Sequence, residues 1–289
     1  MIKPIAINTC YLCSSTEFII RKGQVRDNQD LKILECQSCG LVTLSSLEHI
    51  QAEHYESSGM HGADPVSIDY WSKETIEDDN RRFQMLQLLL KNKKILDFGC
   101  GNGGFLKLAD KLAAKADGVE PEKRVRDYWS GRFNILPDLK FAGELEYDLI
   151  TAFHVIEHLP DPRGVLREIS KHLAPNGKLI LEVPSSEDAL ITLYESHAFM
   201  SFTYWSQHIY LFNTNTLESL VKQAGLKVTT IQQYQRHPIS NHLYWLSKGK
   251  PGGHIEWSFL DSPVLQEAYA GAMRSIGKCD TLIAWLEKD

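Results

Sequence analysis

A cluster of glycines beside a carboxylate is the feature of this sequence that points most directly to chemistry. Gly99, Gly101 and Gly104 follow a short apolar run at 95–96, and a helical pattern begins at Phe105. A strand, a tight glycine turn and a helix form the place where an open parallel sheet receives a nucleotide-like ligand, because glycine lets the ligand lie against bare backbone. Taken alone, the glycine spacing also satisfies the dinucleotide-binding fingerprint.

Asp97 distinguishes between the two kinds of ligand. It ends the predicted strand two residues before Gly99, where it would repel a pyrophosphate but attract the ammonium and sulfonium groups of S-adenosylmethionine (SAM). Glu120 follows about twenty residues later, where a carboxylate can accept hydrogen bonds from both ribose hydroxyls. The two acids, with no Lys or Arg in the turn, favour SAM over NAD. The residues expected to contact the cofactor are Asp97, Gly99, Gly101, Glu120, the adjacent Pro121, and His154 at the end of a later strand on the same sheet edge.

Two Cys-x2-Cys pairs near the start of the chain have the spacing of metal ligands. The pairs comprise Cys10, Cys13, Cys36 and Cys39. Four thiolates complete a tetrahedral zinc site and leave no open position, so we expect structural rather than catalytic zinc. Short apolar stretches at 17–21 and 32–35 predict the strands of a zinc ribbon. The alternative is four buried or free thiols.

The elements that must position these residues alternate between strand and helix. Strands are predicted at 94–98, 116–120, 133–136, 147–154, 179–183 and 226–231, with helices at about 103–114, 122–130 and 214–225 and a further helix from Tyr70. Alternation at this spacing predicts an α/β fold with a Rossmann-like parallel sheet and right-handed crossovers. We expect a last, antiparallel strand at 281–286. The alternative places that strand at 243–246 and makes the tail a packing helix.

Four segments occur in the order found in one enzyme family. They are the glycine turn, the Glu120 segment, the stretch from Asp148-Leu-Ile to Glu157-His-Leu, and the Pro175-Asn-Gly-Lys turn before an apolar strand. Over about residues 75–235 the chain therefore resembles the class I SAM-dependent methyltransferases. The resemblance implies a seven-stranded doubly wound sheet with a final antiparallel strand, and SAM as the cofactor.

The cysteine module adds a similarity to sugar C-methyltransferases. Those enzymes carry a Tyr-x-Glu-His segment where this chain has Trp205 and Gln207 in place of Tyr and Glu, and retains His208. They also continue into a further C-terminal domain, which we do not expect in this protein. The two departures weaken any transfer of C-methylation chemistry.

Two insertions are predicted at the sheet edge that holds the glycine turn, at 184–213 and 236–279. The first is rich in aromatic residues, and the second is rich in His, Asn and Lys, so we expect both to cap the acceptor. His208, with His242 second, is expected to be the base that removes the acceptor's proton, because histidine titrates near neutrality.

Basic residues of the second insertion indicate the charge of the acceptor. Arg236, Lys248 and Lys250 would hold a phosphate or a carboxylate. We therefore expect a small anionic metabolite as acceptor, such as a nucleotide-linked or surface-polysaccharide sugar.

Composition limits the class of protein. The 289 residues carry a net charge of −6 and no long basic run, which argues against a nucleic-acid partner. The start has no signal-peptide core, and no apolar stretch approaches the roughly 20 residues of a membrane span, so we expect a cytoplasmic protein without a membrane partner. Its six cysteines are then expected to be reduced.

The expected organisation has three parts: a zinc-ribbon module at 1–45, a linker with lid helices at 46–94, and a methyltransferase domain at 95–289. Tyr55, Tyr70 and Trp71 are candidate lid residues. The ribbon is also a candidate surface for a homodimer. The alternatives to this interpretation are an NAD-dependent oxidoreductase and a non-catalytic interaction module built on a SAM-binding fold or on the ribbon.

Overall fold

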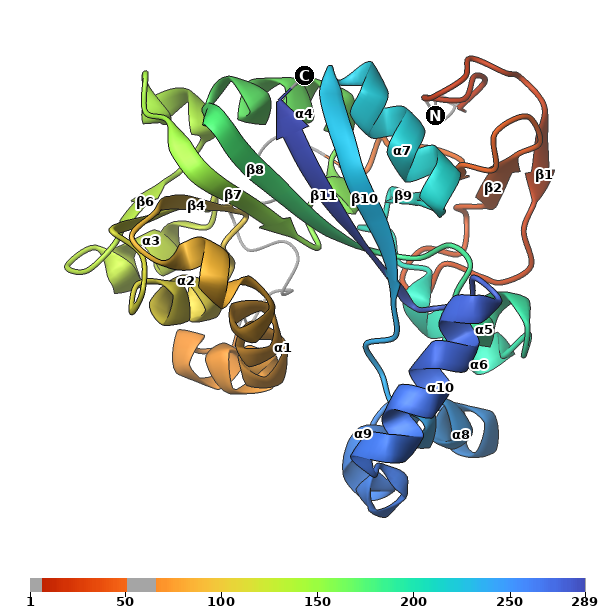
Figure 1. Cartoon of the computed structure of the whole chain (residues 1–289). Helices are drawn as coiled ribbons and strands as arrows, with labels where there is room; N and C mark the ends of the chain where they lie inside the picture. The colour runs from red at the N-terminus through yellow and green to blue at the C-terminus, as the bar shows by residue number, and fades with distance from the viewer. Residues whose placement is uncertain (1–6, 51–65, 289) are drawn as a thin grey trace.

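A seven-stranded sheet forms the centre of the computed structural model, which describes residues 7–50 and 66–288. The strands lie in the order β10-β11-β8-β7-β4-β5-β6 (Figure 1). They are β4 (Lys94–Phe98), β5 (Lys115–Val119), β6 (Asn134–Leu136), β7 (Tyr147–Phe153), β8 (Leu173–Pro184), β10 (Leu226–Tyr234) and β11 (Thr281–Lys288). From β6 to β8 every pairing is parallel, which confirms the predicted α/β sheet.

The last strand, β11, is antiparallel to both of its neighbours, β8 and β10. Most of its side chains are buried, as the continuous apolar run at 281–286 requires of a strand covered on both faces. The alternative strand at 243–246 is wrong. Those residues lie in helix α8 (Ile239–Lys248), where Tyr244 and Trp245 are buried and Leu243 and Leu246 are exposed, a helical period.

Helices cover both faces of this sheet. On one face α1 (Ile68–Leu90), α2 (Gly104–Ala109) and α3 (Lys123–Trp129) bury an apolar cluster that includes Leu86, Phe105 and Val125. On the other face α4 (Pro162–Lys171) and α7 (Thr214–Gln223) pack with residues of the cysteine module. Helix α2 ends earlier than predicted, because the chain turns back so that the Ala114 amide bonds to the Lys93 carbonyl.

The cysteine module is not a separate unit. Its strands β1 (Phe18–Ile20) and β2 (Ile33–Cys36) lie where strands were predicted, and β3 (Val42–Leu44) was not predicted. A fourth strand, β9 (Tyr210–Leu211), completes the antiparallel sheet. Because β9 belongs to the insertion after β8, the module and the insertion share one small core that includes Val42, Tyr204 and Leu211. The module is therefore anchored to the carboxyl edge of the large sheet.

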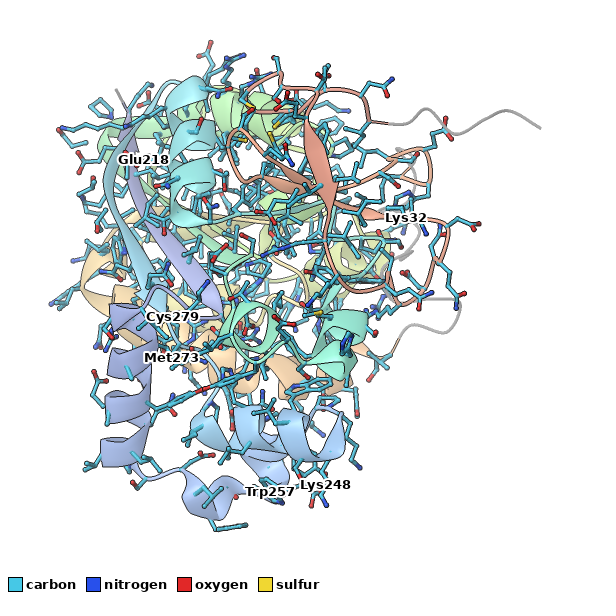
Figure 2. All side chains as sticks on the ribbon, turned by 90° about the vertical axis from the view of Figure 1, so that its right-hand side faces the viewer. Lys32, Glu218, Lys248, Trp257, Met273 and Cys279 are labelled. Atoms are coloured by element: carbon cyan, nitrogen blue, oxygen red, sulfur yellow. The ribbon has the colours of Figure 1, made fainter. Side chains whose placement is uncertain are left out.

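Both insertions lie at that edge. The first holds α5 (Ala189–Thr192) and α6 (His197–Thr203), and the second holds α8, α9 (Gly253–Glu256) and α10 (Pro263–Ser275). The second projects from the sheet as a helical arm (Figure 1), and Figure 2 shows Lys248 and Trp257 near the far end of it. Within residues 7–50 and 66–288, none of the helices has the length and apolar character that a membrane crossing requires.

Candidate cofactor and acceptor site

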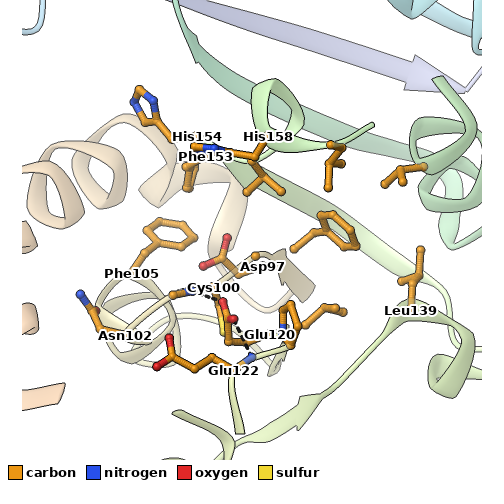
Figure 3. A pocket seen from close by; sticks show the side chains of 18 of the residues that line it. Asp97, Cys100, Asn102, Phe105, Glu120, Glu122, Leu139, Phe153, His154 and His158 are labelled. Atoms are coloured by element: carbon orange, nitrogen blue, oxygen red, sulfur yellow. Dashed lines mark hydrogen bonds between the residues drawn. The ribbon is translucent and has the colours of Figure 1, made fainter. Parts of the chain in front are cut away.

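A cavity of about 960 Å³ opens at the carboxyl ends of β4, β5 and β7. The glycine turn, the loop after β7 and one face of α1 line it. In Figure 3, Asp97, Cys100 and Glu120 lie together on one side, and His154 and His158 lie across the cavity from Glu120. The sequence therefore located both walls of the cavity, since Asp97, Gly99, Gly101, Glu120, Pro121 and His154 all line it.

Asp97 has a buried carboxylate, and few polar contacts offset the cost of its burial. Its Oδ1 accepts one hydrogen bond, from Thr151 Oγ1 at 2.7 Å. Burial raises its pKa to about 7, and the nearby carboxylates of Asp79 and Glu120 add to the rise. A group whose charged form is disfavoured in this way gains from a cationic ligand.

Glu120 directly follows β5 and lies near Asp97. Its Oε2 accepts a hydrogen bond from the Gly101 amide at 3.0 Å, and its Oε1 accepts one from the Glu122 amide at 2.9 Å. Burial raises its pKa to about 7 as well. The carboxylate is thus fixed at the mouth of the glycine turn, where it can accept hydrogen bonds from ligand hydroxyls.

Gly99 and Gly101 have different reasons to be glycine. Gly99 has φ +72°, and a Cβ there would lie 2.5 Å from Val155 Cγ2, so the missing side chain makes room for the loop after β7. Gly101 has φ +50°, and a Cβ there would lie 3.3 Å from the Trp71 ring. Both glycines line the cavity, and the amide of Gly101 also binds Glu120, so a bare backbone beside the ligand stays a prediction for each of them.

The charge of the lining bears on the identity of the cofactor. The described lining residues include eight Asp or Glu and three Lys or Arg. A pyrophosphate would be repelled by such a lining, whereas the ammonium and sulfonium groups of SAM would be attracted. The donor set and the glycine turn therefore fit SAM.

A buried ion network lies behind His154. Glu182 on β8 has a fully buried side chain, and its Oε1 accepts hydrogen bonds from Arg81 Nη2 at 2.7 Å and Arg82 Nη2 at 2.8 Å. His154 Nε2 lies 3.1 Å from the same oxygen. Burial alone would raise the pKa of Glu182, but Arg82, His154 and Arg81 hold it well below its usual range.

Sequence reasoning missed this network. The available signal in the sequence was a single Glu within the apolar run at 179–183. It was accompanied by the adjacent pair Arg81 and Arg82 on α1, the helix before β4. His154 itself adopts φ +54°, an uncommon conformation for a residue with a side chain, which occurs where the surrounding structure imposes it.

Replacing Glu182 with glutamine is expected to lower the free energy of unfolding by about 3 kcal/mol, because it removes the buried carboxylate that Arg81 and Arg82 share and leaves them only their longer ion pairs with Asp78 and Asp79. Urea denaturation measures the change. Glu218→Gln is the matched control, since Glu218 forms an exposed ion pair with Lys222, and this variant should lose less than about 0.5 kcal/mol. Equal losses in the two variants would contradict a stabilising network.

The histidines expected to act on the acceptor lie in different places. His208 packs against His158, with ring centroids 5.0 Å apart, and its Nδ1 lies 3.1 Å from the Thr203 carbonyl oxygen. Burial lowers the pKa of His208 to about 3, with a further contribution from His158. Of these two histidines, His158 lines the cavity and His208 lies behind it.

His242 is not one of the described residues that line the cavity. Its Nδ1 lies 2.6 Å from Tyr269 Oη and its Nε2 lies 3.2 Å from Gln235 Nε2, so both ring nitrogens face protein groups. The sequence placed it at the substrate edge, but α8 directs it into the core of the arm, against α10. We therefore withdraw it as a candidate base.

The basic residues expected to bind an anion are also separated. Arg236 lines the cavity but forms an ion pair with Asp78. Lys248 and Lys250 are exposed on the arm and do not line the cavity. Tyr55, a candidate lid residue, lies outside the described residues, whereas Trp71 does line the cavity.

The four predicted metal ligands are brought together. Cys10 Sγ lies 3.5 Å from Cys39 Sγ, Cys13 Sγ lies 3.5 Å from Cys36 Sγ, and all four sulfurs lie within 4.8 Å of one another. Zn–S bonds of about 2.3 Å in a tetrahedron place sulfurs about 3.8 Å apart. The cluster therefore fits a structural zinc ion, and within residues 7–50 and 66–288 no fifth metal-ligating side chain joins the four sulfurs.

Comparison with known proteins identifies the family. A family model described as a methyltransferase domain matches residues 72–231, more than half of the chain. The chain belongs to this methyltransferase family. Its matched region includes the glycine turn, the cavity residues on β4, β5 and β7, and the Glu182 network.

Curated relatives match over part of their length. An uncharacterized protein of Haemophilus influenzae is 36% identical over 153 residues, and a ubiquinone biosynthesis O-methyltransferase of Xanthomonas euvesicatoria is 27% identical over 145 residues. Each match covers 46% of this chain and 55% of the relative, so the chain spans about half the length of the curated relatives it matches.

A solved structure shares the fold. A SAM-dependent methyltransferase from Archaeoglobus fulgidus superposes with a TM-score of 0.52 at 18% sequence identity, covering 77% of this chain and 95% of that one. At this identity the likeness concerns the arrangement of strands and helices.

Proposed function

We propose that the protein is a SAM-dependent methyltransferase that acts on a small-molecule acceptor. One observation carries the proposal: Asp97 and Glu120 are buried together beside the glycine turn, and burial raises the pKa of each to about 7. Two carboxylates placed at such a cost to their charged forms are explained by a ligand that carries positive charge and hydroxyl groups.

Each residue would have a separate task. Asp97 would attract the cationic part of SAM, and Glu120 would accept hydrogen bonds from the ribose hydroxyls. SAM supplies an already activated methyl group, so the protein has to orient the acceptor and let its proton leave. The acceptor would approach from the wall that contains His154 and His158, across the cavity from Glu120 (Figure 3).

His208 stays our candidate for a group that acts on the acceptor, through its contact with His158. A hydroxyl-bearing acceptor is in keeping with the O-methyltransferase name of one relative. An anionic acceptor such as a nucleotide-linked sugar has less support, because Arg236 is already paired with Asp78. A homodimer formed through the ribbon also stays a prediction, which the mass in solution with and without a chelator would test.

Isothermal titration with S-adenosylhomocysteine, and separately with NADH, tests the cofactor. We expect S-adenosylhomocysteine to bind one site per chain, and NADH to bind at least a hundredfold more weakly because its pyrophosphate would face Asp97. NADH binding as tightly as S-adenosylhomocysteine would favour an oxidoreductase. Absence of binding by both would favour a non-catalytic module.

A further inference from the structure

Three side chains with metal-ligating atoms converge at the end of the cavity opposite Glu120. They are Glu157 and His158, in the 3-10 helix η3 (Ile156–His158) after β7, and His208, in the insertion before β9. One ligating atom of each lies within 4.8 Å of the others, and Glu157 and His158 are buried. Cations with nitrogen and oxygen ligands at about 2.1 Å place adjacent ligands about 3–3.5 Å apart, so small side-chain rotations would close the set.

Hydrogen bonds fix the orientation of both imidazoles. His158 Nδ1 lies 2.8 Å from the Gln207 carbonyl oxygen, and His208 Nδ1 lies 3.1 Å from the Thr203 carbonyl oxygen. A carbonyl only accepts, so each neutral ring carries its proton on Nδ1 and its lone pair on Nε2. Histidines that bind metals characteristically donate their other ring N–H to a carbonyl or a carboxylate in this way.

Glu157 supplies the negative charge. Its side chain is fully buried, and the imidazoles of His154 and His158 near it hold its pKa below the usual value, so it is charged. His154 Nδ1 lies 3.3 Å from Oε1, and His158 Nε2 lies 3.8 Å from the same oxygen. A buried carboxylate of this kind is costly unless a positive charge accompanies it.

We propose that Glu157, His158 and His208 bind a divalent transition-metal ion. Two imidazoles and one carboxylate suit Mn²⁺, Fe²⁺, Co²⁺ or Zn²⁺ better than Mg²⁺ or Ca²⁺, which prefer all-oxygen sites. Three protein ligands leave coordination positions open, and His158 places the site at the cavity wall. If the proposed function is correct, those open positions would bind an oxygen atom of the acceptor.

This site and the cysteine cluster are distinguished by their ligands. Four thiolates select zinc, whereas Mn²⁺ has little affinity for sulfur. The experiment therefore uses the full chain with its cysteines loaded with zinc, and titrates Mn²⁺ while electron paramagnetic resonance reports the free ion. We expect one Mn²⁺ to bind per chain. Co²⁺ bound at the same site should show visible absorption without sulfur-to-cobalt charge transfer.

Variants assign the ligands. Glu157→Gln and His208→Ala should each weaken Mn²⁺ binding at least tenfold, whereas His197→Ala, an exposed histidine of α6, should leave it unchanged. Binding of S-adenosylhomocysteine is measured on every variant, which shows that each one is folded. If the wild-type chain binds S-adenosylhomocysteine but no Mn²⁺ or Co²⁺ beyond the cysteine site, or if the ligand variants bind Mn²⁺ like wild type, the metal site is refuted and the proposed function stands.

Discussion

Replacing Asp97 with asparagine is expected to weaken the binding of SAM by roughly a hundredfold. Removing one partner of a buried charge pair costs about 2–5 kcal/mol, and about 2.7 kcal/mol corresponds to a hundredfold. Asparagine has the shape of aspartate and can keep the contact with Thr151 Oγ1, so the cavity should retain its form. The loss would therefore report the charge at this position.

The same substitution should change how stability depends on pH. The pKa of Asp97 is about 7 in the folded chain, against an ordinary value of 3.8. A raised carboxylate pKa contributes stability that is fully present below about pH 4 and is lost as pH rises through 7. The asparagine variant carries no such charge, so without ligand it should be more stable than wild type at pH 8 and should show a flatter profile. Glu120 keeps a slope of the same sign in both proteins.

Ligand binding should show the opposite trend in wild type. A cationic ligand binds the charged carboxylates, so its affinity should rise between pH 6 and 8 with release of protons. Calorimetric titrations of SAM in buffers of different ionisation enthalpy measure both quantities, and thermal unfolding measures stability. Asp148→Asn is the control, because Asp148 lies near the start of β7 and bonds to Lys93 and Lys94 instead of lining the cavity. Unchanged affinity in Asp97→Asn would refute the electrostatic basis of the proposed function.

Local patterns were sufficient to predict the large sheet and the wall of the cavity that holds Asp97 and Glu120. The run at 95–98, its glycines and the acid at Glu120 lie within one strand-turn-helix-strand unit, so their spacing alone determines that they meet. The last strand was also predictable, because the apolar run at 281–286 has the length and composition of a strand buried on both faces.

The wall of the cavity around His154 and His158, which is the proposed acceptor side, depended on contacts that no local pattern encodes. Arg82 and Glu182 are a hundred residues apart in the chain, and only the packing of α1 against β8 shows that they pair. His242 is of a residue type common in active sites, but the direction of its side chain depends on which face of α8 packs on α10. Likewise, two residues of an insertion complete the sheet of the cysteine module, and a strand of that length has no recognisable sequence signal.

Removing zinc from the cysteine cluster is expected to loosen part of the acceptor side as well as the ribbon. Structural zinc contributes about 10–16 kcal/mol in small zinc modules, so its loss should unfold β1–β3 locally. Tyr11 lies between two of the ligands, and its hydroxyl bonds to Asp161 and accepts from the Arg163 amide at 3.0 Å. Its ring packs against Tyr210 of β9, with centroids 5.3 Å apart. Unfolding of the ribbon would therefore release both the start of α4 and β9.

Hydrogen exchange of the full chain, with a chelator or with Cys10→Ser, would measure this effect. Amide exchange should rise at 10–45 and 204–212, while amides of β4 and β7 should stay protected and S-adenosylhomocysteine should still bind. Cys279→Ser is the matched control: Cys279 is a buried thiol outside the cluster, and its replacement should leave the zinc content unchanged. Unaltered exchange at 204–212 after zinc loss would mean that the apolar contacts of β9 hold the acceptor side by themselves. Zinc would then stabilise only the ribbon, and the cysteines would have no influence on the acceptor side of the cavity.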